Sequence, residues 1–318
     1  YSLLRVSGIV PALLLSSMVI AIVSMFYEKK LGILTSNQSM SKTISIGKKM
    51  LSIGFFLSIN GLLTVGFSYV LRLLITRMGG LEAVGFYNAG YSILTTYVGL
   101  IFNAMATDYY PRLLTVVKDK DELSETVNQQ AIISILILAP IVQVLLVFMN
   151  LIISLLYSKE FTVISGFLNW GILAMYFKAA AWSIGYVFVS KGDTKIFFIN
   201  ELIANIYMLI LSIAGYYIFG LDGLGISMLV GYVIYMIHIN IICCKKYGIK
   251  FKMEFKQIFG TQLTISILIF ILMWSINEGY KYIAGIFLVG ITSLISLREL
   301  EKKVGIVELI KMVGHRKF

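Results

Sequence analysis

The stretch that decides the fold is Gly47–Leu113, which reads GKKMLSIGFFLSINGLLTVGFSYVLRLLITRMGGLEAVGFYNAGYSILTTYVGLIFNAMATDYYPRL. It contains two hydrophobic segments, Leu51–Leu71 and Tyr87–Thr107, and the connection between them holds a Gly79-Gly80 turn signal. At about 1.5 Å of rise per residue, each segment is long enough to cross the hydrocarbon core of a bilayer as a helix. The stretch therefore predicts two consecutive transmembrane helices.

Both segments carry a stripe of polar residues at helical spacing. At about 100° per residue, each stripe stays within an arc of about 120°. The first stripe is Asn60, Gly61, Thr64, Ser68 and Arg72, and the second is Asn88, Ser92, Thr95, Thr96, Gly99, Asn103 and Thr107. A helix that faces only lipid has no use for such a stripe, so we interpret both as facing a watery or protein-lined interior. The open alternative is that small polar residues hold neighbouring helices together.

The composition of the whole chain places it in the membrane. Of its 318 residues, 58% are hydrophobic and 14% are charged, whereas a soluble domain carries about 25% charged residues. The predicted fold class is all-α, a polytopic transmembrane helix bundle, and Asp108–Val127 is expected to add a short interfacial helix. About nine spans are expected, at 7–26, 51–71, 87–107, 131–157, 163–189, 196–218, 223–243, 258–276 and 280–297.

The distribution of Lys and Arg predicts the orientation. If the connection Tyr27–Met50 is cytoplasmic, 21 of the 27 Lys and Arg residues face the cytoplasm and five face the outside. The positive-inside rule favours this arrangement, which puts the beginning of the chain outside and its end in the cytoplasm. The same basic loops account for the net charge of +11 without nucleic acid as a partner. We interpret them as contacts to anionic lipids of the inner leaflet.

The sequence offers few groups for catalysis. It holds two histidines, His238 and His315, and two adjacent cysteines, Cys243 and Cys244. It contains no HExxH, GxSxG, Walker A or CxxC motif, and no carboxylate pair at helical spacing inside one span. We therefore expect a transporter rather than an enzyme, with no cofactor and no metal site.

Charged residues within or at the ends of the predicted spans are the main functional candidates. Lys178 lies near the middle of its span, and we interpret it as a ligand-binding residue; the alternative is a lysine that snorkels to the interface. Its helix face carries small residues that let another helix approach closely or leave room for a ligand, namely Gly171, Ala174, Ala181 and Gly185. Arg72 ends the first stripe near the outer surface, where a guanidinium suits bidentate binding of phosphate. The alternative for Arg72 is an interfacial anchor.

Glu201 is the acidic candidate. It lies just over one turn into its span and shares a face with Asn205 and Ser212. We expect its carboxylate either to pair with Lys191 or Lys195, or to exchange a coupling ion together with Asn205.

Two elements carry a family resemblance. They are Gly80–Ile93, GLEAVGFYNAGYSI, and Asp108–Leu113, DYYPRL. In them the chain resembles the polysaccharide-transporter family, and more narrowly the Wzx-type O-antigen translocases of the multidrug/oligosaccharidyl-lipid/polysaccharide exporter superfamily. Elsewhere only hydropathy and span spacing agree. The family has two six-helix lobes, often followed by two further helices.

The resemblance implies that this chain is the C-terminal part of such a two-lobe transporter, and the beginning at Tyr1 without Met agrees with that expectation. The implied parts are the last helix of the N-terminal lobe (1–26), a cytoplasmic inter-lobe loop (27–50), the C-terminal six-helix lobe (51–243), a basic cytoplasmic loop (244–257), two additional helices (258–297) and a charged cytoplasmic tail (298–318).

The resemblance also implies a function. It is that of a flippase for undecaprenyl-pyrophosphate-linked oligosaccharide, an O-antigen or capsule repeat unit, in the bacterial inner membrane, with alternating access between two lobes. Arg72 and Lys178 would bind the pyrophosphate, and polysaccharide-assembly proteins would be partners. The residues expected to replace water around the sugars are Asn60, Thr64, Ser68, Asn88, Ser92 and Asn103.

Two alternatives remain open. A multidrug or other small-molecule exporter of the same superfamily would share the fold. A membrane enzyme of polysaccharide assembly, a polymerase or an acyltransferase, is disfavoured, because the predicted outer loops are short and no well-placed catalytic histidine is present.

Overall fold

The computed structural model describes residues 9–30, 39–275 and 278–304, and every regular element in these ranges is a helix. The all-α prediction is therefore confirmed for the described residues. The short elements are a π-helical turn, Ile93–Tyr97, and a 3₁₀ turn, Lys159–Ile164. The α-helices are α1 (Ile9–Lys30), α2 (Met40–Ser92), α3 (Val98–Thr115), α4 (Lys120–Leu156), α5 (Ser165–Ser190), α6 (Thr194–Tyr247), α7 (Met253–Ser275) and α8 (Glu278–Val304).

Six helical stretches in the described part are long and apolar enough to cross a membrane. Two of them, Gly54–Thr115 and Thr194–Tyr247, contain 62 and 54 residues. A single crossing needs about 20 residues, so each of these two is longer than one span. The chain is a multi-pass membrane protein, and the count of nine spans stays a prediction.

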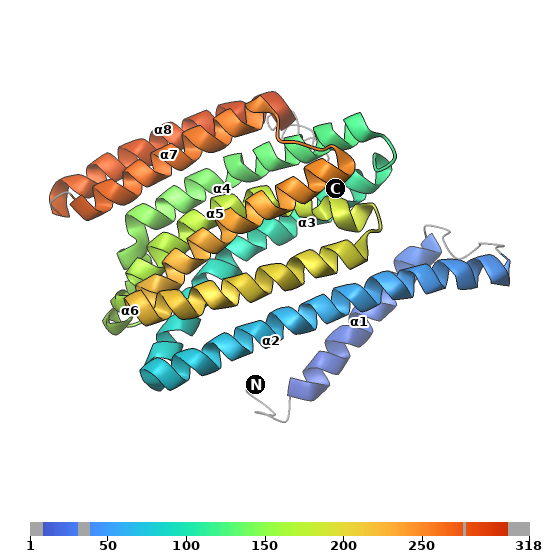
Figure 1. The fold of residues 1–318 in the computed structure, drawn as a ribbon, viewed down its shortest axis with the longest axis horizontal. Helices are drawn as coiled ribbons and strands as arrows, with labels where there is room; N and C mark the ends of the chain where they lie inside the picture. Colours follow the sequence, from blue (N-terminus) through green and yellow to red (C-terminus); the bar gives the residue numbers. More distant parts are fainter. Residues whose placement is uncertain (1–8, 31–38, 276–277, 305–318) are drawn as a thin grey trace. The chain divides into compact units, whose positions relative to one another are not determined.

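Glycines reverse the chain inside the two longest stretches. Gly80 has φ 82° and Gly220 has φ 60°, in the region that residues with a Cβ avoid. Across the second turn, the Ser227 hydroxyl donates to the Leu211 carbonyl oxygen at 2.7 Å, so the two arms of α6 lie side by side (Figure 1). The first turn lies at the predicted Gly79-Gly80 signal, and the second lies in the short connection between the spans predicted at 196–218 and 223–243.

The chain divides into two compact units, Tyr1–Gly54 and Phe55–Phe318. In the first, α2 begins at Met40, so residues 40–50 are helical although they were expected in a loop. The reason is local: Lys and Met favour helix, the single Gly47 is tolerated within it, and no proline separates this segment from the apolar span that follows.

The expected interfacial helix at Asp108–Val127 is also corrected, because these residues end α3 and begin α4. α3 ends at Thr115, and Asp119 starts α4. Its carboxylate accepts the backbone N–H groups of Asp121 at 2.8 Å and Glu122 at 3.0 Å, which caps α4.

The core of the second unit is centred on α5, which packs against α4 and α6. A buried polar link ties it to the additional helices: Ser266 of α7 lies 2.7 Å from the Tyr176 hydroxyl and accepts a hydrogen bond from Gln143 of α4 at 3.1 Å. Figure 1 shows α7 and α8 side by side next to α4.

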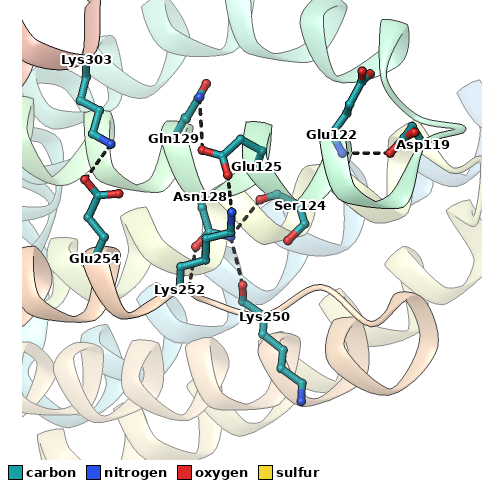
Figure 2. Close-up of polar contacts among 10 residues, drawn as sticks. All are labelled: Asp119, Glu122, Ser124, Glu125, Asn128, Gln129, Lys250, Lys252, Glu254 and Lys303. Atoms are coloured by element: carbon teal, nitrogen blue, oxygen red, sulfur yellow. Dashed lines mark hydrogen bonds and ion pairs between the residues drawn. The ribbon is translucent and has the colours of Figure 1, made fainter.

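Polar contacts fasten the α6–α7 connection to α4 (Figure 2). The Asn128 amide donates to the Lys250 carbonyl oxygen at 3.0 Å and accepts the Lys252 backbone N–H at 2.7 Å. The Lys252 ammonium bonds the Glu125 carboxylate, and this bond and its charge raise the pKa of Lys252. These contacts fix where α7 begins.

A second group of contacts joins the start of α6 to its end, 54 residues later in the chain. Asp193, just before α6, accepts a hydrogen bond from the Tyr247 hydroxyl and pairs with the Lys246 ammonium at 2.9 Å. Partial burial acts to raise the pKa of Asp193, but these two bonds and the neighbouring positive charges outweigh it, so the pKa lies below its usual value.

Candidate functional site

A cavity of about 530 Å³ lies among α2, α3, α5 and α6. Four of the sequence-predicted candidates line it, namely Thr64, Lys178, Glu201 and Asn205. Much of its wall is aromatic, formed by Tyr110, Trp182, Tyr186, Phe197, Tyr232 and Tyr235. A mostly apolar cavity with a few polar groups is typical of a ligand site.

Lys178 supplies the positive charge of this cavity. Its ammonium nitrogen lies 5.5 Å from the centre of the Phe102 ring and 5.6 Å from that of Tyr232, within range of cation–π attraction. No carboxylate within the described ranges forms an ion pair with it. Gly185, two turns further along α5, also lines the cavity, and a Cβ built there would meet open space. The charge of Lys178 is therefore available to a ligand.

Glu201 supplies the negative charge. Its carboxylate accepts a hydrogen bond from the Tyr235 hydroxyl, and its backbone carbonyl oxygen accepts from the Asn205 amide at 2.8 Å. Among the described residues Glu201 forms no ion pair with either of the two expected lysines, and the Lys191 ammonium instead donates to the carbonyl oxygen of Val117. The two arms of α6 therefore hold the carboxylate inside the membrane bundle.

A second hollow of about 170 Å³ continues from the cavity towards Arg72. Thr64, Asn205 and Tyr232 line both, so the two are adjacent. Ser68 and Tyr91 line only the smaller one, together with Tyr87 and other residues.

Arg72 does not itself line the smaller hollow but lies next to Tyr91, which does. Its guanidinium carbon is 6.0 Å from the centre of the Tyr91 ring, and its Nε donates to the Asn88 side-chain oxygen at 2.7 Å. The first stripe therefore contains Thr64, which lines the cavity, and ends with the positively charged Arg72.

Most of the second stripe lies outside both hollows. Asn88, Ser92 and Asn103 are exposed, and the Ser92 hydroxyl lies 3.5 Å from that of Thr96. Asn60, in the first stripe, also lines neither hollow, and its buried side-chain oxygen has no hydrogen-bond partner among the described residues. The structure thus brings part of the predicted set together and leaves the rest on another face.

The π-helical turn Ile93–Tyr97 interrupts this second stripe. Its Thr95 hydroxyl donates to the Tyr91 carbonyl oxygen at 2.7 Å. Such turns are rare and frequently lie at functional sites, and this one follows directly after the Tyr91 that lines the smaller hollow.

The aromatic wall was missed from the sequence. An aromatic residue in an apolar span is equally typical of the core and of a surface that contacts lipid. Its residue type therefore does not predict whether the side chain faces the cavity. The available signal was the pair Tyr232 and Tyr235 in mid-span, because a buried phenol needs a polar partner. Glu201 is that partner for Tyr235.

The chain is similar to a known family, to a curated protein and to a solved structure. The family model described as "Polysaccharide biosynthesis protein" matches residues 1–166. A Shigella flexneri protein named "Putative O-antigen transporter" is 22% identical over 186 residues, which cover 55% of this chain and 44% of that protein. The solved structure titled "Lipid II flippase MurJ, inward closed conformation" has a TM-score of 0.56 and 16% identity, over 76% of this chain and 53% of that chain. This chain spans about half the length of the relatives it matches, and the structural match shows a shared fold.

Proposed function

Since the chain belongs to the family of polysaccharide biosynthesis proteins, we propose that it forms part of a flippase-type transporter for a lipid-linked saccharide. The relative named as an O-antigen transporter and the fold shared with a lipid II flippase support this class of activity. The membrane-length helices supply a bundle through which a polar headgroup can pass.

The substrate in this proposal is an undecaprenyl-pyrophosphate-linked oligosaccharide, an O-antigen or capsule repeat unit, moved across the bacterial inner membrane. Two lobes that rock about a central cavity would give alternating access. In this arrangement the residues described here supply one lobe, and the prenyl tail stays in the lipid.

The observation that carries the proposal is the charge of Lys178 inside the cavity. A lysine in a membrane bundle is costly and is kept where it serves a ligand or a partner. Here the ammonium lies against two rings, and the described part of the chain gives it no ion pair. A phosphate group of the substrate would supply the missing negative charge, and the aromatic wall would pack against the apolar faces of sugar rings.

Arg72 and the polar residues of the first stripe extend this role. Arg72 would bind the pyrophosphate as it enters or leaves, since its guanidinium can make two parallel hydrogen bonds to phosphate. Thr64 and Ser68 line the route between the two cations and would replace water around the sugars.

Glu201 and Asn205 are the proposed ion-coupling residues. Glu201 shares the cavity with Lys178 but bonds Tyr235, so a proton or a sodium ion could bind the carboxylate without breaking an ion pair. Asn205, bonded to the Glu201 carbonyl oxygen, would place its side-chain oxygen beside the same ion.

The experiment that tests the proposal deletes the gene in its own organism and follows the lipid-linked repeat unit. We expect surface polysaccharide to be lost and the lipid-linked unit to accumulate in the cytoplasmic leaflet, with both restored by the wild-type gene. An unchanged polysaccharide together with new sensitivity to small toxic compounds would refute it. That result would favour the small-molecule exporter, to which the apolar and aromatic cavity wall is also suited.

A further inference from the structure

A separate cavity of about 560 Å³ lies between α3 and α4, beside the end of α8. It shares no residue with the site described above. Its lining residues are Ala104, Met105, Asp108, Arg112, Gln129, Gln130, Ile133 and Lys303. Asp108 and Arg112 belong to the DYYPRL element, and the proposed transport route gives neither of them a role.

Arg112 has hydrogen-bonding capacity that the protein does not fill. One terminal nitrogen, Nη2, donates to the Gln130 side-chain oxygen at 3.0 Å. The Nε atom is buried and has no acceptor among the described residues. The Gln130 bond therefore holds the guanidinium in place and leaves its other N–H groups unpaired.

Asp108 is the other unpaired charge. It lies four residues before Arg112 on α3, a spacing at which opposite charges often pair. In the part of the chain that the structure describes, the carboxylate makes no ion pair or hydrogen bond with Arg112 or with any other residue. Four residues correspond to about 6 Å along a helix, so two opposite charges lie apart on one cavity wall.

Two of the other polar lining residues are already engaged (Figure 2). The Lys303 ammonium pairs with the Glu254 carboxylate at 2.6 Å, and the Gln129 amide donates to Glu125 at 3.4 Å. A ligand of this cavity would therefore meet mainly Asp108 and Arg112.

The depth of the cavity indicates the ligand's origin. Arg112 lies three residues before the end of α3, and Asp108 seven residues before it, which is about 5 Å and 10 Å along the helix. The headgroup layer of one leaflet is about 5 to 8 Å thick. With the end of α3 at the membrane surface, the two residues would lie near the boundary between headgroups and hydrocarbon. Ala104, Met105 and Ile133 continue the cavity wall with apolar surface, as suits the rest of a lipid.

We propose that this cavity binds the headgroup of a zwitterionic aminophospholipid, with its phosphate at Arg112 and its protonated amine at Asp108. A guanidinium matches phosphate, and a carboxylate matches a primary ammonium with N–H donors. A lipid with a net negative charge fits less well, because Asp108 would repel it. The inference requires only that the protein lies in a membrane, so failure of the proposed transport activity would leave it standing.

The test measures lipid binding by native mass spectrometry of the purified protein. Phosphatidylethanolamine, phosphatidylcholine and phosphatidylglycerol are added separately at equal concentrations. We expect phosphatidylethanolamine to bind several-fold more tightly than the other two. Asp108→Asn should remove the preference for phosphatidylethanolamine over phosphatidylcholine. Arg112→Gln should weaken the binding of both of these lipids by about tenfold, and Arg112→Lys should weaken it less. Asp121→Asn, an exposed carboxylate outside the cavity, is the matched control.

Three outcomes would overturn the proposal. The first is equal binding of all three lipids, with variants that behave like the wild type. The second is tighter binding of phosphatidylglycerol that improves in Asp108→Asn, which would make this a site for anionic lipid. The third is displacement of bound phosphatidylethanolamine by undecaprenyl pyrophosphate at equal concentration, which would assign the cavity to the transported lipid. Thermal unfolding of each variant checks that lost binding is not lost folding.

Discussion

Replacing Lys178 by methionine removes the positive charge of the central cavity while keeping a side chain of similar length. The ammonium lies 5.5 and 5.6 Å from two ring centres and has no ion pair among the described residues. A methionine can pack against the same Phe102 and Tyr232 rings. The fold should therefore tolerate Lys178→Met, and the lost property should be the attraction for a phosphate.

The magnitude follows from one charged contact. A hydrogen bond to a charged group contributes about 1.5 to 3 kcal/mol. At about 1.4 kcal/mol per tenfold change in affinity, the loss of one such bond reduces substrate binding by about 10- to 150-fold. Lys178→Arg should keep most of the activity, because it keeps the positive charge and the cavity of about 530 Å³ leaves space for the longer side chain.

The assay is restoration of surface polysaccharide in the deletion strain, with the membrane level of each variant measured in the same samples. Lys195→Met, an exposed lysine that lines neither hollow, is the matched control and should restore polysaccharide as the wild type does. If Lys178→Met reaches normal levels and restores polysaccharide fully, its charge does not bind substrate. The lysine would then be a packing residue, and the cationic-cavity proposal would fail for this part of the protein.

The remaining predictions concern the second cation, a stabilising contact and the topology. Arg72→Lys should restore polysaccharide to a level between the wild type and Arg72→Gln, because lysine keeps the charge but loses the bidentate geometry; equal activity of all three would contradict this. Asn128→Ala should lower the free energy of unfolding in detergent by about 1 to 3 kcal/mol, since it leaves two backbone groups of the α6–α7 connection without their partner, whereas Gln129→Ala should change it little. Cysteines placed at Lys118 and Lys159 should be labelled only from the cytoplasm and only from outside, respectively, and the reverse pattern would invert the orientation.

The fold was largely predictable because hydrophobic length and glycine turns are local signals. Gly80 and Gly220 stand out in sequence, and each has the positive φ that a reversal requires. The helix ends were less predictable. Residues 40–50 and 108–127 carry many polar side chains, which is typical of a loop or an interface. Helix α2 nevertheless includes the whole of the first segment, and α3 and α4 extend into the second from either side up to a break at residues 116–119.

The candidate site was predictable only in part, because spacing gives the face of a helix but not the helix it meets. Thr64, Lys178, Glu201 and Asn205 were chosen separately from three segments, and packing places them in one cavity. The partner of Glu201 could not be read from spacing, since Tyr235 approaches it across the Gly220 turn, 34 residues later.

The exposed second stripe constrains what surrounds this bundle. Asn88, Ser92, Thr96 and Asn103 lie on the exposed side of the segment that ends α2 and continues into α3. The Asn88 amide oxygen accepts from Arg72, but the Asn103 side chain has no hydrogen-bond partner among the described residues. An amide that faces hydrocarbon without a partner costs several kcal/mol, at roughly 4 to 8 for transfer to an apolar solvent. That face must therefore meet water or another protein segment within the membrane. In the two-lobe arrangement proposed above, this face would border the space between the lobes, and the second stripe would add polar contacts for the sugars outside the cavity that holds Lys178.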